Sequence, residues 1–153
     1  MSDAQPAARA RPDAPRAASC TFCRIVTGEL AAHTVLDDDR FLAFLDTTPL
    51  FPGHVLLVPK EHHETLWDLP DDLLGPLNER TRRLAEAVRA ATGSQGIFTA
   101  TNNVVSQSVP HLHVHVVPRN RKDGLRGFFW PRTKYASDDD AEAMARRIRE
   151  ATG

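Results

Sequence analysis

The chain of 153 residues lacks the features that define several large classes of protein. It has only two cysteines, which excludes a scaffold held together by several disulfide bonds. No apolar run approaches the ~20 residues that a membrane-spanning helix needs, and the first twenty residues lack the apolar block of a secretory signal. The net charge of −1 at pH 7 provides no bulk attraction to nucleic acid or to an anionic membrane. We therefore expect a cytoplasmic protein that binds neither nucleic acid nor membrane.

The composition is that of a globular protein, with 41% hydrophobic and 25% charged residues, and the length fits one domain. The first nineteen residues differ, because they are mostly Ala, Pro, Arg and Asp with almost no large apolar side chain. Such a segment buries too little surface to offset the entropy of ordering it. Two aspartates and three prolines argue against an organelle-targeting helix there. We expect a disordered tail over residues 1–19 and a single domain over residues 20–153.

The hydrophobic pattern predicts an antiparallel sheet. Residues 33–46 indicate two strands around a turn at Asp37–Arg40, and three further strands are expected at 53–59, 96–103 and 111–118. The last two are joined by the short stretch 104–110, which is typical of a hairpin-like link. Strands clustered around one long helix indicate the α+β class.

Helical spacing predicts three helices. A short helix is expected near residues 22–30, and a long one at 71–92 has an apolar stripe made of Leu73, Leu77, Leu84, Val88 and Ala91. A terminal helix should follow Ser137, whose hydroxyl can cap it. Its apolar stripe comprises Ala141, Met144, Ala145 and Ile148.

Three histidines alternate with apolar residues in the segment HLHVHVVPR, His111–Arg119. Successive side chains of a strand point to opposite faces, so His111, His113 and His115 should project together at about 7 Å spacing. A strand face that is merely solvated could equally carry Lys, Glu or Thr. Histidine at three alternating positions therefore favours a chemical role. Such a cluster can bind a metal, bind an anion or perform nucleophilic and acid–base chemistry.

Two segments carry a family resemblance. QSVPHLHVHVVPR, Gln107–Arg119, resembles the signature of the histidine-triad (HIT) superfamily, and FLAFLDTTPLFPGHVLLVPKEH, Phe41–His62, resembles its companion segment. The similarity runs from Cys20 to Arg119 with both motifs in the family's order. The resemblance implies a fold of five antiparallel strands and a long helix, joined across a two-fold axis into a homodimer.

The resemblance also implies a reaction on a nucleotide substrate. A substituent is cleaved from the α-phosphate of a nucleoside monophosphate through a nucleotidyl-histidine intermediate, and no catalytic cofactor is required. His113 is the expected nucleophile, with its second ring nitrogen held by a backbone carbonyl of the same strand. His115 and His54 would contact the non-bridging phosphate oxygens or support the nucleophile. Ser108 and Gln107 would donate to the phosphate or to the leaving group.

Nucleoside recognition is assigned by the same match to the first half of the chain. Phe22, Ile25 and Phe44 would line a base pocket, and Asp46 would accept hydrogen bonds from both ribose hydroxyls, which favours ribonucleotides. Ordinary core packing is the alternative for the three apolar residues. Asn102 resembles a residue near the α-phosphate and ribose, although its loop is shorter than in many relatives.

Cys20 and Cys23 offer a second site. A disulfide between cysteines so close in the chain would be strained. With His62 and His111 they resemble the ligand set of a closed structural zinc site, and His63 competes with His62 for this role. Zinc there would tie the N-terminal segment to the catalytic strand without activating water. Two reduced, buried cysteines are the alternative.

Several functions stay open at this level. Pro118 and Arg119 resemble the branch that hydrolyses dinucleoside polyphosphates, whereas Phe128–Arg132 resembles the nucleoside-phosphoramidase branch. A module that only binds a mononucleotide and acts through partners would use the same pocket. A metallohydrolase would instead use the three alternating histidines as zinc ligands with an open coordination position.

Overall fold

The computed structural model describes residues 14–125 and 133–152. The chain falls into two compact units that divide after Arg121. In the parts that the structure describes, no helix combines the length and the apolar character needed to cross a membrane. Phe128–Arg132 lies outside these parts.

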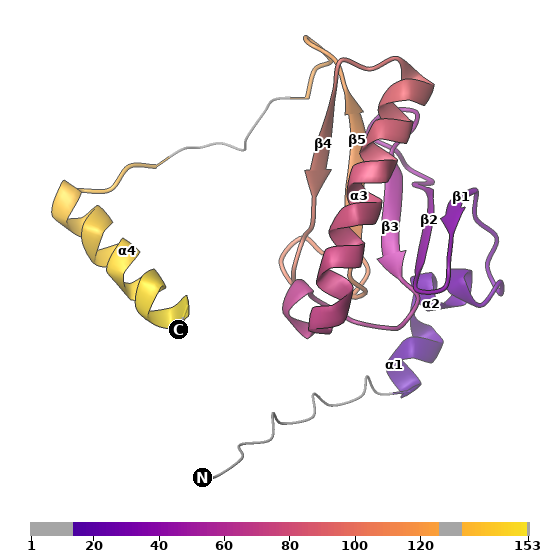
Figure 1. Ribbon diagram of the computed structural model, residues 1–153, viewed down its shortest axis with the longest axis horizontal. Helices are drawn as coiled ribbons and strands as arrows, with labels where there is room; N and C mark the ends of the chain where they lie inside the picture. Colours follow the sequence, from indigo (N-terminus) through magenta and orange to yellow (C-terminus); the bar gives the residue numbers. More distant parts are fainter. Residues whose placement is uncertain (1–13, 126–132, 153) are drawn as a thin grey trace. The chain divides into compact units, whose positions relative to one another are not determined.

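The first unit contains a five-stranded antiparallel sheet, as the sequence predicts. Its strands are β1 (Thr34–Asp37), β2 (Phe41–Leu45), β3 (Val55–Pro59), β4 (Gly96–Ala100) and β5 (Val114–Arg119), in the order β1-β2-β3-β5-β4 (Figure 1). Every neighbouring pair is antiparallel. The predicted turn between β1 and β2 is held by Asp38, whose Oδ1 accepts hydrogen bonds from the backbone N–H groups of Arg40 and Phe41.

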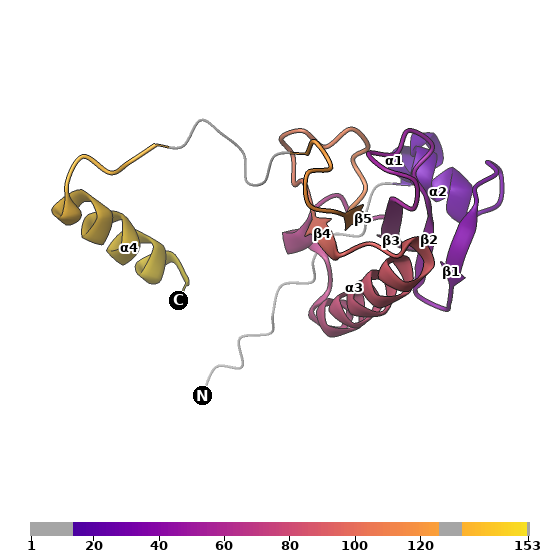
Figure 2. The same cartoon turned by 90° about the horizontal axis from the view of Figure 1, so that it is seen from above.

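Both faces of the sheet are covered. Along β3, Val55 and Leu57 belong to the core cluster that also contains the buried residues of the long helix, whereas Leu56 and Val58 belong to a second cluster with Phe22. The alternation follows from the two-residue period of a strand. Figure 2 shows the long helix on one face and the N-terminal helices on the other. A continuous apolar run is therefore required in this central strand.

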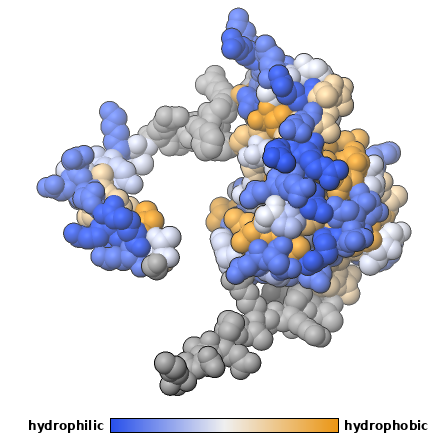
Figure 3. All heavy atoms as spheres, in the orientation of Figure 1, coloured by the Kyte–Doolittle hydropathy of each residue, from blue (hydrophilic) through white to orange (hydrophobic). Residues whose placement is uncertain are grey.

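The long helix, α3 (Asp71–Thr92), has the predicted bounds. It buries Leu73, Leu77, Leu84 and Val88 against the sheet, and its outward side is largely hydrophilic (Figure 3). Gly93 follows it with φ 66°, a left-handed conformation that glycine adopts at low cost. Ala91 was expected in the apolar stripe but is exposed, because it lies in the last turn beyond the edge of the core.

The N-terminal segment carries two short helices, α1 (Ala14–Ser19) and α2 (Thr21–Val26). The expected disordered tail thus gives way to helix over its last six residues, and the rest of that prediction lies outside the described residues. A single-turn 3-10 helix, η1 (Leu66–Asp68), precedes α3. The second unit contains α4 (Asp138–Thr152), which Ser137 caps as predicted, since its Oγ accepts a hydrogen bond from the backbone N–H of Asp140 at 3.1 Å.

Several strand boundaries differ from the prediction, three of them by two or more residues. β3 begins two residues later than expected, after Gly53, whose φ is 99°, and β4 ends at Ala100 rather than at Asn103. β5 begins at Val114 rather than at His111, because the backbone N–H of Leu112 donates to the carbonyl of His63 beyond the end of β3. The link from β4 to β5 is correspondingly longer than the predicted hairpin connection.

Candidate active site and metal-ligand cluster

The alternating histidines lie on the face of the sheet that carries Phe22. His111 and His113 precede β5 and His115 lies within it. The rings of His113 and His115 are 4.9 Å apart, and the ring of Phe22 lies edge-on to those of His111 and His113. Leu112, Val114 and Val116 pack in the opposite core cluster. The alternation of faces predicted from the sequence is therefore present, although the first two histidines are outside the strand proper.

His113 has a fixed tautomer. Its Nδ1 lies 2.7 Å from the carbonyl oxygen of His111, and because a carbonyl only accepts, Nδ1 carries the proton. Nε2 then holds a lone pair. Burial lowers the pKa of His113, so the neutral ring is the form present at pH 7. The structure thus provides the arrangement that nucleophilic attack by Nε2 requires.

His54 and His115 form a second ordered pair. The backbone N–H of Leu50 donates to Nδ1 of His54 at 3.1 Å, so the proton of the neutral ring sits on Nε2. That Nε2–H lies 2.9 Å from Nδ1 of His115 and donates to it. His115 consequently carries its own proton on Nε2. Burial, with smaller contributions from His113 and His54, lowers the pKa of His115 to about 4, so this donor is neutral at pH 7.

A pocket of about 430 Å³ adjoins these rings. Its lining includes Phe22, Ile25, Phe44, Asp46, Ser108, His113 and His115, with Thr48 and Leu56 among the others. The rings of Phe22 and Phe44 meet edge-on at 5.4 Å. The lining therefore combines aromatic and aliphatic side chains with imidazoles, a hydroxyl and a carboxylate. This combination suits a flat apolar group attached to a polar one.

The carboxylate of Asp46, in the lining of this pocket, has a defined orientation. Its Oδ1 accepts a hydrogen bond from the backbone N–H of Thr48 at 2.9 Å, and its Oδ2 is 3.7 Å from Nε2 of His54. The same carboxylate opposes the lowering of the pKa of His54 by burial. Asp46 is thus oriented by its own turn and has acceptor capacity left for a ligand.

Cys20, Cys23, His62 and His111 come together as a second cluster, their ligand atoms all within 4.8 Å of one another. Sγ of Cys23 lies 3.2 Å from Nδ1 of His62, and Nδ1 of His111 lies 3.4 Å from Sγ of Cys20. Nε2 of His111 donates to the carbonyl of Pro59 at 2.8 Å, so its Nδ1 presents a lone pair to the thiols. His63 is not in the cluster.

These four residues fit a tetrahedral metal. Two sulfur and two imidazole donors are the set that zinc prefers in closed sites. Burial and the neighbouring Cys20 raise the pKa of the Cys23 thiol to about 12, so a metal would have to displace its proton. Oε1 of Glu64 lies 4.0 Å from Nε2 of His62, beyond hydrogen-bond distance.

Asp46, His54 and His115 also lie close enough together to be considered as metal ligands. The proton positions argue against this use. Nε2 of His54, the atom that faces the other two residues, carries a hydrogen because Nδ1 already accepts from Leu50. A metal there would have to break the Leu50–His54 hydrogen bond. We therefore treat the three residues as a hydrogen-bonded group.

Comparison with known proteins decides the family. The HIT domain matches residues 27–122, more than half of the chain. The chain belongs to the HIT family. A HIT-like protein of Methanocaldococcus jannaschii is 39% identical over 107 residues, covering 69% of this chain and 82% of the relative. The adenosine 5′-monophosphoramidase of Saccharomyces cerevisiae is 34% identical over 109 residues, covering 71% and 68%.

Solved HIT structures share the fold. A member of the family from Bacillus subtilis aligns with a TM-score of 0.79 at 30% identity, covering 86% of this chain and 96% of that one. A zinc-bound histidine triad family protein from Mycobacterium smegmatis aligns with a TM-score of 0.68 at 31% identity, covering 88% and 99%. The expected α+β HIT fold is confirmed.

Three residues expected near the phosphate, His54, Asn102 and Gln107, are not among those that line the pocket of this HIT domain. His54 instead donates a hydrogen bond to His115, which does line the pocket. The side chain of Gln107 is engaged elsewhere, because its Nε2 donates to the carbonyl of Glu64, after β3, and its Oε1 accepts from the backbone N–H of Val104 in its own loop. Gln107 therefore ties its loop to the segment at Glu64, and the neighbouring Ser108 and Val109 reach the pocket.

The groups that sequence reasoning missed are mostly backbone groups. The N–H of Leu50 and the carbonyl of Pro59 orient His54 and His111, yet every residue type offers a carbonyl and nearly every one an N–H. Sequence reasoning also did not name Glu64, whose carboxylate lies 4.0 Å from the ring of His62. Its position two residues after this candidate ligand could have suggested it.

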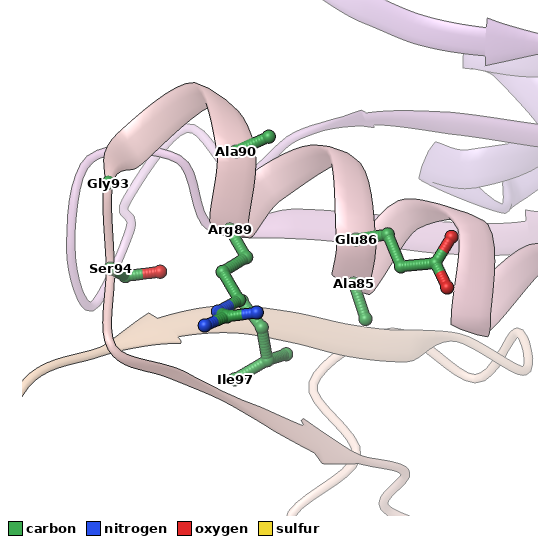
Figure 4. Close-up of a pocket in the computed structure, with 7 residues that line it drawn as sticks. All are labelled: Ala85, Glu86, Arg89, Ala90, Gly93, Ser94 and Ile97. Atoms are coloured by element: carbon green, nitrogen blue, oxygen red, sulfur yellow. The ribbon is translucent and has the colours of Figure 1, made fainter.

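A separate hollow lies where α3 ends and β4 begins. Figure 4 shows its lining, which combines Ala85, Glu86, Arg89, Ala90, Gly93, Ser94 and Ile97. It contains no histidine or cysteine and lies apart from the nucleotide-type pocket of the HIT domain.

Proposed function

We propose that the protein is a HIT-family hydrolase that releases a nucleoside monophosphate from a substituent on its α-phosphate. The observation that carries this proposal is the His113 imidazole, whose Nδ1 proton is held by the His111 carbonyl and whose Nε2 lone pair stays available beside a pocket of nucleotide size. The yeast relative that is an adenosine 5′-monophosphoramidase supports the same kind of reaction.

The first step is attack on phosphorus. Nε2 of His113 forms a bond to the α-phosphorus while the bond to the substituent breaks, and the substituent leaves with a proton taken from solvent. The Nε2–H of His115 and the hydroxyl of Ser108 donate hydrogen bonds to the phosphate oxygens, where negative charge develops. The His111 carbonyl stabilises the positive charge that the His113 ring acquires.

The second step is hydrolysis. Water attacks the phosphorus, the bond to His113 breaks, and the monophosphate leaves as a proton returns to solvent. His113 regains its starting tautomer because its Nδ1 proton never leaves the carbonyl of His111. The residues named here account for both steps with imidazole chemistry.

The nucleoside would lie in the rest of the pocket. The base would contact Phe22, Ile25 and Phe44, and the ribose hydroxyls would donate to Asp46, whose carboxylate is already oriented by Thr48. Two hydrogen bonds to one carboxylate would favour ribose over deoxyribose.

Phosphoramidates are the substrate class that we favour over dinucleoside polyphosphates. The additional phosphates of a dinucleoside polyphosphate would need cationic partners such as Arg119 and Arg121. These two residues line a different hollow, together with Gln95, Gly96 and Asn120. In the β4–β5 register, Arg119 is opposite Gly96 whereas His115 is opposite Ala100, so this hollow is at the other end of the strand. No arginine or lysine is among the described residues that line the nucleotide-type pocket.

The test is turnover of adenosine 5′-phosphoramidate beside diadenosine polyphosphates, in the native protein and in His113→Asn. We expect the phosphoramidate to be the better substrate, and the variant to lose at least about 10³-fold in kcat/KM while AMP still binds. His33→Ala, at an exposed histidine, is the matched control. Intact mass of quenched reactions should show one nucleotidyl group per chain. AMP binding without turnover in the native protein would indicate a binding module instead.

We further propose that Cys20, Cys23, His62 and His111 hold structural zinc. Bound there, zinc would cross-link α2 to the start of the histidine segment, and with four protein ligands it would activate no water. The donor set, the lone pair of His111 Nδ1 and the zinc-bound relative support this assignment. The two cysteines are free thiols, in keeping with a reducing compartment, and we place the enzyme in the cytoplasm.

A homodimer is the assembly that we propose. β4 is the last strand of the sheet and pairs on one side with β5, so its other edge is available to a second copy. Exposed edge strands pair readily with other chains. The hollow beside it includes apolar Ala85, Ala90 and Ile97, and the buried Oγ of Ser94 has no hydrogen-bond partner among the described residues (Figure 4).

A further inference from the structure

We infer that metal in the Cys20–Cys23–His62–His111 cluster and nucleotide in the pocket strengthen each other's binding, with Phe22 as the positioning residue that connects the two sites. The inference rests on the function and the metal site proposed above. It adds a coupling between them, so metal occupancy would set nucleotide affinity.

Phe22 is the first connection. It lies between Cys20 and Cys23 in the chain, and 6% of its side chain is exposed. The centroid of its ring is 5.9 Å from that of His111 and 5.1 Å from that of His113. The same ring lines the nucleotide pocket and packs on Phe44. One side chain therefore contacts a candidate metal ligand, the candidate nucleophile and the wall of the pocket.

His111 is the second connection. Its Nδ1 faces the two thiols at 3.4 and 3.5 Å, and its Nε2 is held by Pro59. Its backbone carbonyl holds the Nδ1 proton of His113. A residue that fixes the tautomer of the nucleophile is thus itself fixed by the metal cluster.

The helix that carries Phe22 is joined to the rest of the fold partly through this cluster. α2 has six residues, too few for a helix to be stable without tertiary contacts. The contacts between sulfur and imidazole join this helix to segments 39 to 91 positions away, at 3.2 to 3.5 Å. In the metal-free protein these are weak sulfur–imidazole contacts. Metal coordination would replace them with four strong bonds and hold Phe22 and Ile25 in place against the sheet.

Coupling between the two sites then follows from the conformational entropy that binding costs. A nucleotide that binds the metal-free protein must order the pocket wall formed by α2, whereas a nucleotide that binds the metal-loaded protein meets a wall that is already ordered. Linkage makes the effect reciprocal, so nucleotide must raise metal affinity by the same factor. The two affinities can be measured separately, and neither measurement depends on turnover.

The experiment is a thermodynamic cycle on the full chain with AMP and zinc. Calorimetry gives the Kd of AMP for the zinc-loaded protein and for protein stripped by a chelator. Competition with a chelator of known affinity, starting from the loaded protein, gives the Kd of zinc with and without saturating AMP. We expect both ratios to agree at about fivefold or more. Ratios of one would overturn the inference, and this second measurement needs no folded metal-free protein.

Two variants locate the coupling. Phe22→Leu leaves the four ligands intact and should bring the AMP ratio close to one. Ile25→Val, on the same helix and in the same pocket, should weaken AMP equally in both metal states and leave the ratio unchanged. A full ratio in Phe22→Leu would reject Phe22 as the connection. Failure of AMP to bind even the loaded native protein would reject the proposed function, whereas binding with no coupling would reject this inference alone.

Discussion

Nε2 of His54 lies 2.9 Å from Nδ1 of His115, although 61 positions separate the two residues in the chain. Because the backbone N–H of Leu50 occupies Nδ1 of His54, the direction of this hydrogen bond is set, and His115 is left with a proton on Nε2. A single backbone amide thus determines which atom of a distant histidine can donate to a phosphate. Such control of tautomer is as important for catalysis as the presence of the ring.

The pH dependence of kcat/KM tests the neutral state of these rings. Protonation of His113 places a hydrogen on Nε2 and removes the attacking lone pair. Burial lowers the pKa of His113 below the usual 6.5 and that of His115 to about 4, so each ring stays neutral to a lower pH than an ordinary imidazole. We expect activity to be constant near neutrality and to fall on the acid side with a midpoint below pH 6.5. A midpoint at or above pH 6.5, with the fold intact by circular dichroism, would contradict the lowered pKa of the buried His113 ring.

Asp46→Asn tests ribose recognition. The amide keeps the shape of the side chain but loses the charge that strengthens hydrogen bonds from the ribose hydroxyls. We expect the ratio of AMP to dAMP affinity to fall by about tenfold, equivalent to ~1.4 kcal/mol. Thr48→Ala is the control, because the backbone N–H that orients Asp46 is retained. An unchanged ratio in Asp46→Asn would place the ribose elsewhere.

Adjacent histidines test the metal site. Nδ1 of His62 lies 3.2 Å from Sγ of Cys23, whereas Nε2 of His63 lies 3.4 Å from the carboxylate of Glu61. We expect the native protein and His63→Ala to retain about one zinc per chain after dialysis, and His62→Ala to lose it. Elemental analysis of the three proteins decides the assignment. Equal zinc in both variants would show that His62 is not a ligand.

Edge charges test the dimer. Thr99 is exposed on β4, and Thr34 is exposed on β1 at the opposite edge of the sheet. Thr99→Lys would bring like charges together across a two-fold axis and should convert a dimer to a folded monomer. Thr34→Lys should remain dimeric. Light scattering after size exclusion measures both, and a native monomer would refute the proposed assembly.

Much of the fold follows from local patterns. The bounds of α3 were predicted because its buried residues recur at helical spacing, and the two faces of the strands were predicted because side chains alternate. Boundaries at the ends of strands were less accurate. β5 starts late because Leu112 bonds to His63, a partner that only the folded chain provides.

The candidate site likewise combines features that the sequence predicts with features that only the folded chain reveals. The residue types were identified through the motifs, and the folded chain gathers most of them around the pocket or the metal cluster. Gln107 was expected at the phosphate, yet its polar groups join its own loop to the backbone at Glu64. A glutamine can serve either role, and only its neighbours in space decide between them.

The sequence by itself determined the chemical groups and the face that each would occupy, since residue type and strand period are local properties. The tertiary structure alone decided where the ring protons of His54 and His111 lie, through the amide of Leu50 and the carbonyl of Pro59. The reason is physical: backbone amides and carbonyls are chemically alike at almost every position, so only the contacts that folding creates can select the ones that orient a ring.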